Sequence, residues 1–409
     1  MKRVVVTGMG VVSPVGNDVA IVFDRLLAGE SAVKRLPESF NERLKSRMVA
    51  PSVLGADRRV PPARARMLDR VSQFALAACA SAIADAQLVL VDEDASQIGV
   101  SIGTGMGGAQ STDDGYQSVY EQQSERVAPF SVILAMNNAP ASWIAIEHNL
   151  QGPNLTYSTA CSSSAVAIGE AARRIAHGGA QVMIAGGTEA PLTFGTLKAW
   201  EALKTLAQED IGNPRASCKP FSRDRSGLVL GEGAAILVLE DAEHARLRGA
   251  RVHAEVAGYG LATDTEHITR PSVRGQAKSM ALALASARLE PLDIGYINAH
   301  GTGTRANDGV ETAAIKEAFG RAAQRCPISS TKSMHGHLLG AAGALEFIIA
   351  VMAMKRSVVP PTAHLRIADP ECDLDYVAEG ARRIPTPTAV MSNSFAFGGA
   401  NAVLVARQI

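Results

Sequence analysis

Short apolar runs alternate with longer Ala-rich segments along much of the chain. The apolar runs predict buried strands over 4–6, 98–102, 155–159 and 182–185, and glycines after several of these runs predict tight turns. The Ala-rich segments predict helices over 20–27, 72–86, 165–176 and 341–355. Strands that alternate with helices predict an α/β fold with parallel strands. The polar segment 30–65, rich in Pro and Arg, is typical of a surface excursion.

The two halves of the chain share a weak sequence similarity. VVVTGMG at 4–10 resembles EVAGYG at 255–260, and an Ala-rich segment follows each, at 73–87 and 277–289. In both halves a strand and a Gly-Thr-Gly turn come next, the turns at 103–105 and 301–303. Short Val/Gly strings recur by chance, but the shared order of three features favours a duplicated α/β unit.

Composition excludes several classes of protein. A chain of 409 residues is long enough for a large core and two domain-sized halves. Its 40 acidic and 40 basic residues cancel, so no global basic field attracts nucleic acid, while a local basic patch for an acidic carrier stays open. The longest strongly apolar stretch, 344–354, is about half of the ~20 residues that a membrane span needs.

The start of the chain and its cysteines bear on the compartment. MKRVVV can pass for the beginning of a signal peptide, but Thr7-Gly8 breaks the apolar run at once, so we reject that interpretation. The five cysteines are scattered without a CxxC spacing, which favours reduced thiols in a cytoplasm.

One cysteine differs from the others in its local context. Cys161 lies between the predicted strand 155–159 and the predicted helix 165–176, hence at a strand-to-helix turn. The positive end of a helix dipole stabilises a thiolate, and free N–H groups at that end can bind an oxyanion. Most cysteines are simply small buried hydrophobes. That interpretation is preferred for the remaining four, Cys79, Cys218, Cys326 and Cys372.

Two histidines in Gly-rich turns favour a functional role for Cys161. His300 lies in NAHGTGT at a predicted strand end, and His337 lies in SMHGHLLG ahead of an apolar helix. Lys332 stands five residues before His337, and Glu346 nine residues after it, inside that helix. Turns at the ends of regular elements are where active-site residues are usually placed.

A last Gly-rich turn, SNSFAFGGAN at 392–401, carries Phe395 and Phe397. Aromatic side chains in such a turn are costly to expose, so they either gate an apolar tunnel or pack inside a hairpin. The turn can also offer a backbone N–H to an oxyanion.

The motifs TACSS, NAHGTGT, STKSMHGHLLGAAGALE and SNSFAFGGAN, in this order, resemble those of the elongating β-ketoacyl-acyl carrier protein synthases. The resemblance begins at VVVTGMGVVSPVG and extends over essentially the whole chain. It implies the thiolase-type fold, in which duplicated α/β halves form a five-layered αβαβα architecture, and a homodimer. Residues 1–250 would form the half with the nucleophilic cysteine, and residues 251–409 the half with both histidines and the gate loop.

The resemblance also implies the reaction, a decarboxylative Claisen condensation by an acyltransferase of fatty acid synthesis. An acyl group is held on Cys161, malonyl-acyl carrier protein loses carbon dioxide, and His300 and His337 donate N–H groups to the enolate oxygen. Lys332 is expected to orient the histidine turn rather than act as a nucleophile. Glu346 is expected to pair with Lys332 or with nearby backbone.

Substrate-contacting positions follow from the same resemblance. Thr302 and Thr304 match contacts to the pantetheine arm, Phe397 matches the gate with Phe395 as its support, and Met106 matches the lining of the acyl pocket. Three positions depart from the family pattern and bear on chain length, namely Ser131, His335 and Ala396.

The implied partner is acyl carrier protein carrying acyl and malonyl groups, with no nucleic acid and no membrane. Candidate docking cations are Lys45, Arg64 and Arg66. No cofactor or metal is implied, although a structural monovalent cation is compatible with the family. The cytoplasm is the expected location.

Rival functions find less support in the sequence. GxGxxG at 103–108 follows a strand but is not followed by an apolar helix, so we reject a nucleotide site. The histidines lack acidic or cysteine partners at ligand spacing, which argues against zinc. A thiolase would need a second cysteine before Gly398, and an initiating synthase an asparagine in place of one histidine. A ketosynthase of a polyketide or nodulation-type pathway and a non-catalytic chain-length subunit stay as alternatives, and chain length is not determined.

Overall fold

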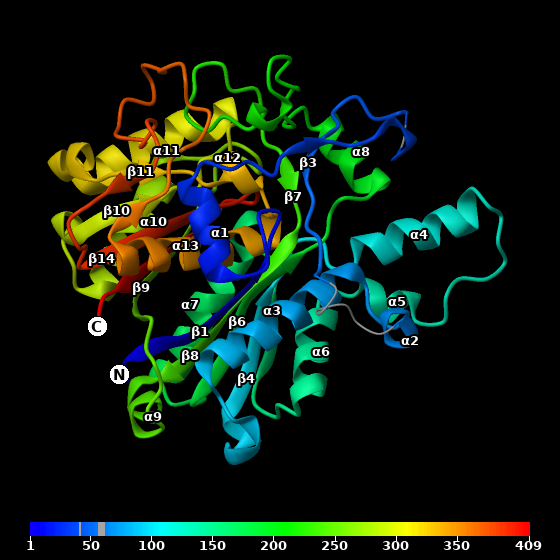
Figure 1. The fold of residues 1–409 in the computed structure, drawn as a ribbon, viewed down its shortest axis with the longest axis horizontal. Coiled ribbons are helices and arrows are strands. Elements are labelled where there is room, and N and C mark those ends of the chain that lie inside the picture. Colours follow the sequence, from blue (N-terminus) through cyan, green and yellow to red (C-terminus); the bar gives the residue numbers. More distant parts are fainter. Residues whose placement is uncertain (41, 56–61) are drawn as a thin grey trace.

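The fold is known from a computed structural model, which describes residues 1–40, 42–55 and 62–409 (Figure 1). Part of the predicted surface excursion, residues 41 and 56–61, lies outside the described residues. In the first half the elements are β1 (Val4–Val12), α1 (Val19–Leu27), β2 (Lys34–Arg35), β3 (Met48–Ala50), α2 (Pro62–Ala65), α3 (Arg70–Ala86), β4 (Ile98–Gly103), α4 (Ala109–Tyr120), α5 (Ser131–Ala135), α6 (Ala139–His148), β5 (Asn154–Tyr157), α7 (Ser163–Ala176), β6 (Val182–Glu189), α8 (Phe194–Ala202), β7 (Leu230–Gly231), β8 (Gly233–Asp241) and α9 (Ala242–Leu247).

The second half follows after a short connection. Its elements are β9 (Ala254–Thr263), α10 (Val273–Ala287), β10 (Ile294–Asn298), α11 (Arg305–Phe319), β11 (Ile328–Ser329), α12 (Lys332–His335), α13 (Ala342–Arg356), β12 (Val358–Val359), β13 (Arg382–Arg383), β14 (Ala389–Phe395) and β15 (Ala400–Arg407).

The large sheet has the same topology twice. One half runs β1-β8-β6-β4-β5 and the other β9-β15-β14-β10-β11. In each half two neighbouring pairs are parallel, β4 with β5 and β6, and β10 with β11 and β14, while the remaining pairs are antiparallel. β1 and β9 pair at Val5–Glu255 and Val6–Ala254, which joins the two halves at one edge. The weak similarity between the two halves in sequence therefore corresponds to a duplicated strand topology.

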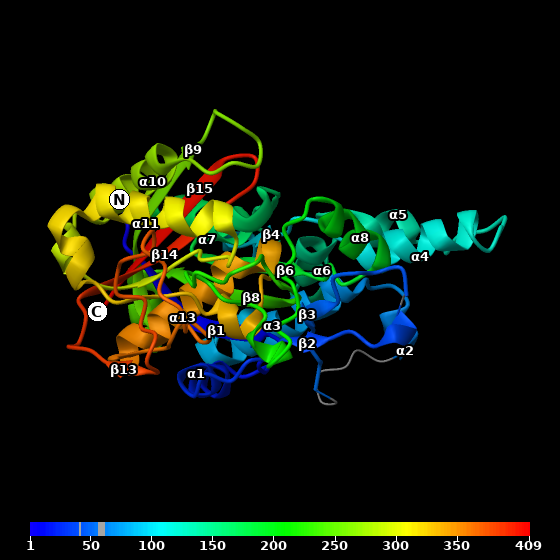
Figure 2. The same cartoon turned by 90° about the horizontal axis from the view of Figure 1, so that it is seen from above.

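Five layers follow from the packing of helices on this sheet. α3 and α6 cover the outer face of the first half, and α10 with α11 behind it covers the outer face of the second. α7 and α13 lie between the halves, contact each other, and pack on β4 and β6 and on β10 and β14 respectively (Figure 2). The αβαβα expectation is confirmed.

Two of the predicted glycine turns are wrong. β1 continues through Gly8 and Gly10 because α3 packs directly on them, and a Cβ atom would come within 2.1 Å of the carbonyl oxygens of Ala82 and Ala78. β6 likewise continues through the glycines that follow 182–185. In β9, Gly258 and Gly260 face the α10 backbone in the same way. These glycines permit close contact between helix and sheet rather than a turn.

One part of the molecule extends away from the layered body. α4 and α5 project sideways in both views (Figures 1 and 2). This arm exposes large apolar side chains, among them Tyr116, Tyr120, Phe130, Val132 and Ile133. Within the described residues, no helix combines the length and the hydrophobicity that a membrane crossing demands.

Candidate active site

Cys161 occupies the strand-to-helix turn that the sequence predicts. β5 ends at Tyr157, a 3₁₀ turn covers Ala160–Ser162, and α7 begins at Ser163. Ala160 has a φ of +51°, a left-handed conformation that costs energy for a residue with a Cβ atom. The hydroxyl of Ser163 accepts the N–H of Thr159 at 2.9 Å and donates to the carbonyl of Ala160 at 2.6 Å, which holds this strained turn in place.

The thiol of Cys161 is buried, and its ionisation reflects that burial. Desolvation raises the pKa of Cys161 to about 12, while the charge of Lys332 and the backbone N–H of Phe397 oppose the rise. The positive N-terminal end of α7 also lowers the pKa of Cys161, as Lys332 does. The resting thiol is therefore protonated at neutral pH, whereas the sequence led us to expect a helix-stabilised thiolate.

Three turns that are distant in sequence converge at Cys161. His300 follows β10, and His337 lies between α12 and α13. Sγ of Cys161 and one ring nitrogen of each histidine all lie within 4.8 Å of one another. The two imidazole rings are 5.3 Å apart between centroids and nearly perpendicular, at 82°. Each turn follows a strand of one of the two parallel sets: Cys161 comes after β5, His300 after β10, and His337 after β11 and the short helix α12.

Hydrogen bonds to the far ring nitrogens fix which nitrogen carries the proton. Nδ1 of His337 accepts the N–H of Leu339 at 3.2 Å, and Nδ1 of His300 lies 3.4 Å from Nζ of Lys332, which can only donate. The proton of each neutral ring is therefore on Nε2. Burial, followed by the charge of Lys332, lowers the pKa of both histidines well below 6.5. Both rings are neutral donors into the site.

Lys332 and Glu346 form a buried ion pair behind the histidines. Nζ of Lys332 lies 2.5 Å from Oε1 of Glu346 and donates to the carbonyl oxygen of His300 at 2.6 Å. Both side chains are inaccessible to solvent. Burial raises the pKa of Glu346, and the charge of Lys332 opposes that rise. The lysine is thus held as a fixed cation beside His300.

Two carboxylates that the sequence analysis missed hold the His300 turn. Glu311 accepts the backbone N–H groups of His300 and Gly301 at 2.8 and 2.7 Å. Asp308 accepts the N–H groups of Thr302 and, more weakly, of the next residue, at 3.1 and 3.3 Å. Both acids are fully buried on α11, three residues apart. The sequence signal that could have revealed them is the pair of acids in the helix that directly follows NAHGTGT.

The gate turn lies against an aromatic side chain of α8. The rings of Phe397 and Trp200 are stacked, with centroids 5.9 Å apart and planes 21° from parallel. Phe395 is buried and meets His300 edge-on at 6.0 Å. The N–H of Gly398 donates to the carbonyl oxygen of Ile268 at 2.7 Å, which ties the turn to a second loop. Trp200 was also missed as a site residue.

These elements enclose a cavity of about 240 Å³. Its lining includes Thr302 and Thr304 together with the cysteine, both histidines and both phenylalanines. Met106 is not among the lining residues of this cavity and is 38% exposed. In this single chain, Met106 thus lies apart from the site to which the resemblance assigns it.

The Gly-rich turn after β4 is already occupied by a carboxylate. Glu189, at the end of β6, accepts the N–H groups of Gly105 and Met106 at 2.7 and 3.0 Å, and that of Gly340 at 2.9 Å. A helix, α4, does follow this turn, but the N–H groups that would bind a phosphate are taken. This arrangement supports the rejection of a nucleotide site.

The sequence predicts no zinc site because no ligand partner stands near the histidines along the chain, but Cys161 joins His300 and His337 in space. The same three atoms that can ligate a metal also suit a thiol nucleophile beside two hydrogen-bond donors. His335 takes no part, because its ring nitrogens lie 2.7 Å from Gly336 O and 2.9 Å from Thr331 Oγ1.

Comparison with known proteins agrees with this geometry. The family model described as "Beta-ketoacyl synthase, N-terminal domain" matches residues 1–245, and the corresponding C-terminal domain matches residues 253–366. 3-Oxoacyl-(acyl-carrier-protein) synthase 2 of Staphylococcus aureus (strain N315) is 40% identical over 407 residues, 99% of this chain and 98% of that protein. Nodulation protein E of Rhizobium meliloti (strain 1021) is 42% identical over 408 residues, with all of both chains covered.

Solved structures give the same result. A β-ketoacyl synthase from Burkholderia phymatum STM815 superposes with a TM-score of 0.92 at 38% identity over the whole of both chains. A type II polyketide ketosynthase, solved in complex with its acyl-carrier protein, superposes with a TM-score of 0.91 at 32% identity, again over the whole of both chains.

Proposed function

This chain belongs to the β-ketoacyl synthase family, and we propose that it joins an acyl group held on Cys161 to malonyl-acyl carrier protein, with loss of carbon dioxide, in fatty acid synthesis. The observation that carries the proposal is the convergence of the Cys161 thiol with the Nε2–H groups of His300 and His337. The product is a β-ketoacyl thioester.

The first step transfers the acyl group to the enzyme. Sγ of Cys161 attacks the thioester carbonyl, the bond to the carrier's sulfur breaks, and the thiol proton ends on that leaving sulfur. The oxyanion that forms lies between the backbone N–H groups of Cys161 and Phe397, of which the second already points at the sulfur.

The second step forms the carbon–carbon bond. Malonyl thioester loses carbon dioxide, and negative charge develops on the thioester oxygen. His300 and His337 donate to that oxygen through Nε2, and each positioned donor of this kind contributes ~3 kcal/mol. Both rings stay neutral because their pKa values are depressed, so they act as hydrogen-bond donors. The carbanion then attacks the acyl carbonyl on Cys161.

The remaining site residues position the substrates. Thr302 and Thr304 line the cavity and are suited to contact a pantetheine arm. Phe397, stacked on Trp200, gates the acyl pocket, and Phe395 supports His300. Met106 keeps a proposed role in the acyl pocket only if a second subunit encloses it.

Two partners belong to the proposal. A second copy of the chain covers the apolar arm of α4 and α5 and the outer edge of β5, which is the last strand of its sheet. Acyl carrier protein docks on cations at the rim. Lys45 and Arg66 are exposed, whereas Arg64 already pairs with Glu147, so the first two are the better candidates.

The chemistry needs no cofactor. A structural monovalent cation would find ligands beside Glu311, to which the amide of Asn393 donates at 3.3 Å, because the side-chain oxygen of Asn393 is buried and has no hydrogen-bond partner among the described residues. All five cysteines are free, which supports a reducing compartment such as the cytoplasm. The full-length match to nodulation protein E keeps a specialised lipid pathway as the second candidate.

Intact-mass analysis with a ladder of acyl-carrier proteins tests the proposal. The wild-type enzyme should gain the mass of one acyl group, and peptide mapping should place it on Cys161. In the Cys161→Ala variant, peptide mapping should find no acyl group at residue 161, whereas the matched control Cys79→Ala, altered inside α3, should be acylated on Cys161 as the wild type is. Acylation of Cys161 without any condensation product would leave the chain as a binding subunit and reject the proposed reaction.

A further inference from the structure

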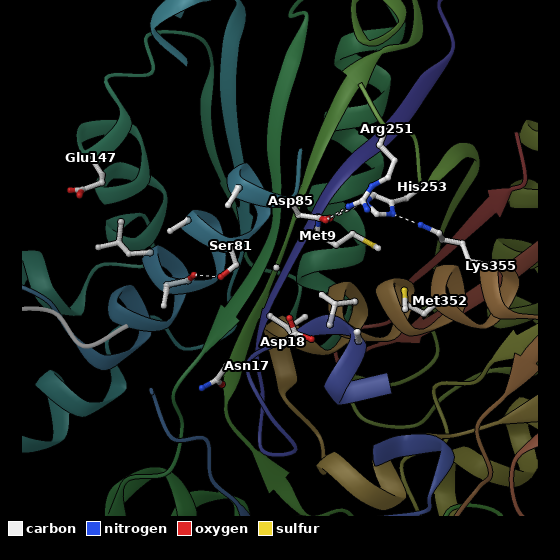
Figure 3. Close-up of a pocket in the computed structure, with 18 of the residues that line it drawn as sticks. Met9, Asn17, Asp18, Ser81, Asp85, Glu147, Arg251, His253, Met352 and Lys355 are labelled. Atoms are coloured by element: carbon white, nitrogen blue, oxygen red, sulfur yellow. Dashed lines mark hydrogen bonds and ion pairs between the residues drawn. The ribbon is translucent and has the colours of Figure 1, made fainter. Parts of the chain in front are cut away.

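A second cavity, of about 830 Å³, lies between α1, α3 and the start of β9 (Figure 3). Among the described residues, none lines both this cavity and the Cys161 cavity. Its floor is apolar and includes Val11, Leu76, Ala77 and Met352. Three guanidinium groups also line it, and each is paired with a carboxylate: Arg64 with Glu147, Arg251 with Asp85 and Arg356 with Asp24. The proposed condensation makes no use of this cavity.

A hydrogen-bonded chain of three side chains lies in the cavity wall. Nζ of Lys355, near the end of α13, is 2.5 Å from Nδ1 of His253, and Nε2 of His253 is 2.8 Å from a carboxylate oxygen of Asp85. Asp85 also accepts the N–H of Met9 at 2.9 Å and pairs with Arg251. Figure 3 shows the amine, the imidazole and the carboxylate in one line.

This order assigns the protons. Asp85 only accepts, so Nε2 of His253 carries a proton and Nδ1 presents a lone pair to Lys355. The ammonium group of Lys355 thus has a proton acceptor within hydrogen-bond distance. Burial and the charge of Arg251 lower the pKa of Lys355, although Asp85 acts in the opposite direction. A nucleophile beside a base that a third group orients is the arrangement found in covalent catalysis.

We propose that Lys355 is a nucleophilic amine and that acyl thioesters entering this cavity acylate it. The apolar floor suits the acyl chain of such a thioester. The Lys355 nitrogen attacks the carbonyl carbon, an amide bond forms and the carbon–sulfur bond breaks. Of the two protons that leave the nitrogen, one passes through His253 to the departing sulfur and the other goes to solvent.

The test uses the full-length protein with Cys161→Ala, so that no acyl group arrives through the condensation site. Acetyl-coenzyme A is the probe, and peptide mapping by mass spectrometry follows acetylation of Lys355. Lys278, an exposed lysine of α10, is the internal control. A general base typically contributes about 10²-fold or more, and partial exposure reduces this, so we expect Lys355 to react at least about 10-fold faster than Lys278.

The second arm of the test replaces His253, the proposed base. His253→Gln keeps a polar group in place but cannot take up the proton, so acetylation of Lys355 should fall to the rate of Lys278. Condensation activity of His253→Gln with Cys161 intact checks that the variant folds. Equal rates at Lys355 and Lys278 in the parent protein would overturn the proposal, and so would fast acetylation of Lys355 in a folded His253→Gln variant. Neither outcome bears on the role of Cys161.

Discussion

Replacing Lys332 with methionine removes one half of a fully buried ion pair. Glu346 would be left without the cation that lies 2.5 Å away, in a place that solvent does not reach. Removing one member of such a pair costs about 3–5 kcal/mol, because the remaining charge stays desolvated. The hydrogen bond from Nζ to the carbonyl of His300 is lost as well. We expect Lys332→Met to lower the free energy of unfolding by at least about 3 kcal/mol.

The loss should depend on pH in a defined direction. Burial raises the pKa of Glu346, and the charge of Lys332 opposes that rise. Removing Lys332 therefore raises the pKa of Glu346 further. The folded variant then keeps a proton on Glu346 that the unfolded chain releases above its ordinary pKa of about 4.3. Since the folded state binds more protons, its stability falls as pH increases through this range. Burial raises the pKa of Glu346 to about 7 in the wild type as well, so both proteins share this fall up to about pH 7. The deficit should therefore be nearly constant below about pH 7 and grow above it.

Denaturant unfolding of the wild type and of Lys332→Met at several pH values measures this loss of stability, and two further variants serve as controls. Lys198→Met removes a partly exposed pair with Glu201, and such pairs contribute about 0–1 kcal/mol, so it should change little. Lys332→Met combined with Glu346→Leu removes both charges and should recover much of the loss. A deficit below about 1 kcal/mol for Lys332→Met, or one that does not change with pH, would refute the reasoning.

Three further predictions concern the site. Because His337 and His300 have depressed pKa values and stay neutral, the decarboxylation rate should not fall as pH decreases from about 8 to about 6.5, which stopped-flow release of carbon dioxide can measure. Glu311→Gln weakens the charge-assisted bonds to the His300 turn, so kcat should fall while the Cys161 acylation mass shift persists. Trp200→Ala removes a stack worth about 0.5–1.5 kcal/mol on the gate, so KM for long acyl chains should change several-fold more than KM for acetyl.

Local sequence rules succeeded where neighbouring residues decide the structure. The helix predicted over 20–27 is α1, and Asp18 caps its start, with its side chain accepting the N–H of Ile21. The same rules were wrong at Gly8 and Gly10. A glycine that ends a strand cannot be told from sequence alone from a glycine that lets a helix pack closely on the strand. Met106 shows a second limit, since a match to a family position does not say which subunit encloses the side chain.

The sequence alone determined the duplicated α/β plan and the chemical identity of the nucleophile and the two imidazoles, because periodicity and motif order are properties of the chain itself. The tertiary structure alone decided the protonation of the site. Burial and the charge of Lys332 keep both rings neutral, and the N–H of Leu339 places the proton of His337 on Nε2. Burial also keeps the thiol protonated, against the charge of Lys332. Desolvation and hydrogen-bond direction depend on groups far apart in sequence, so no local pattern encodes them.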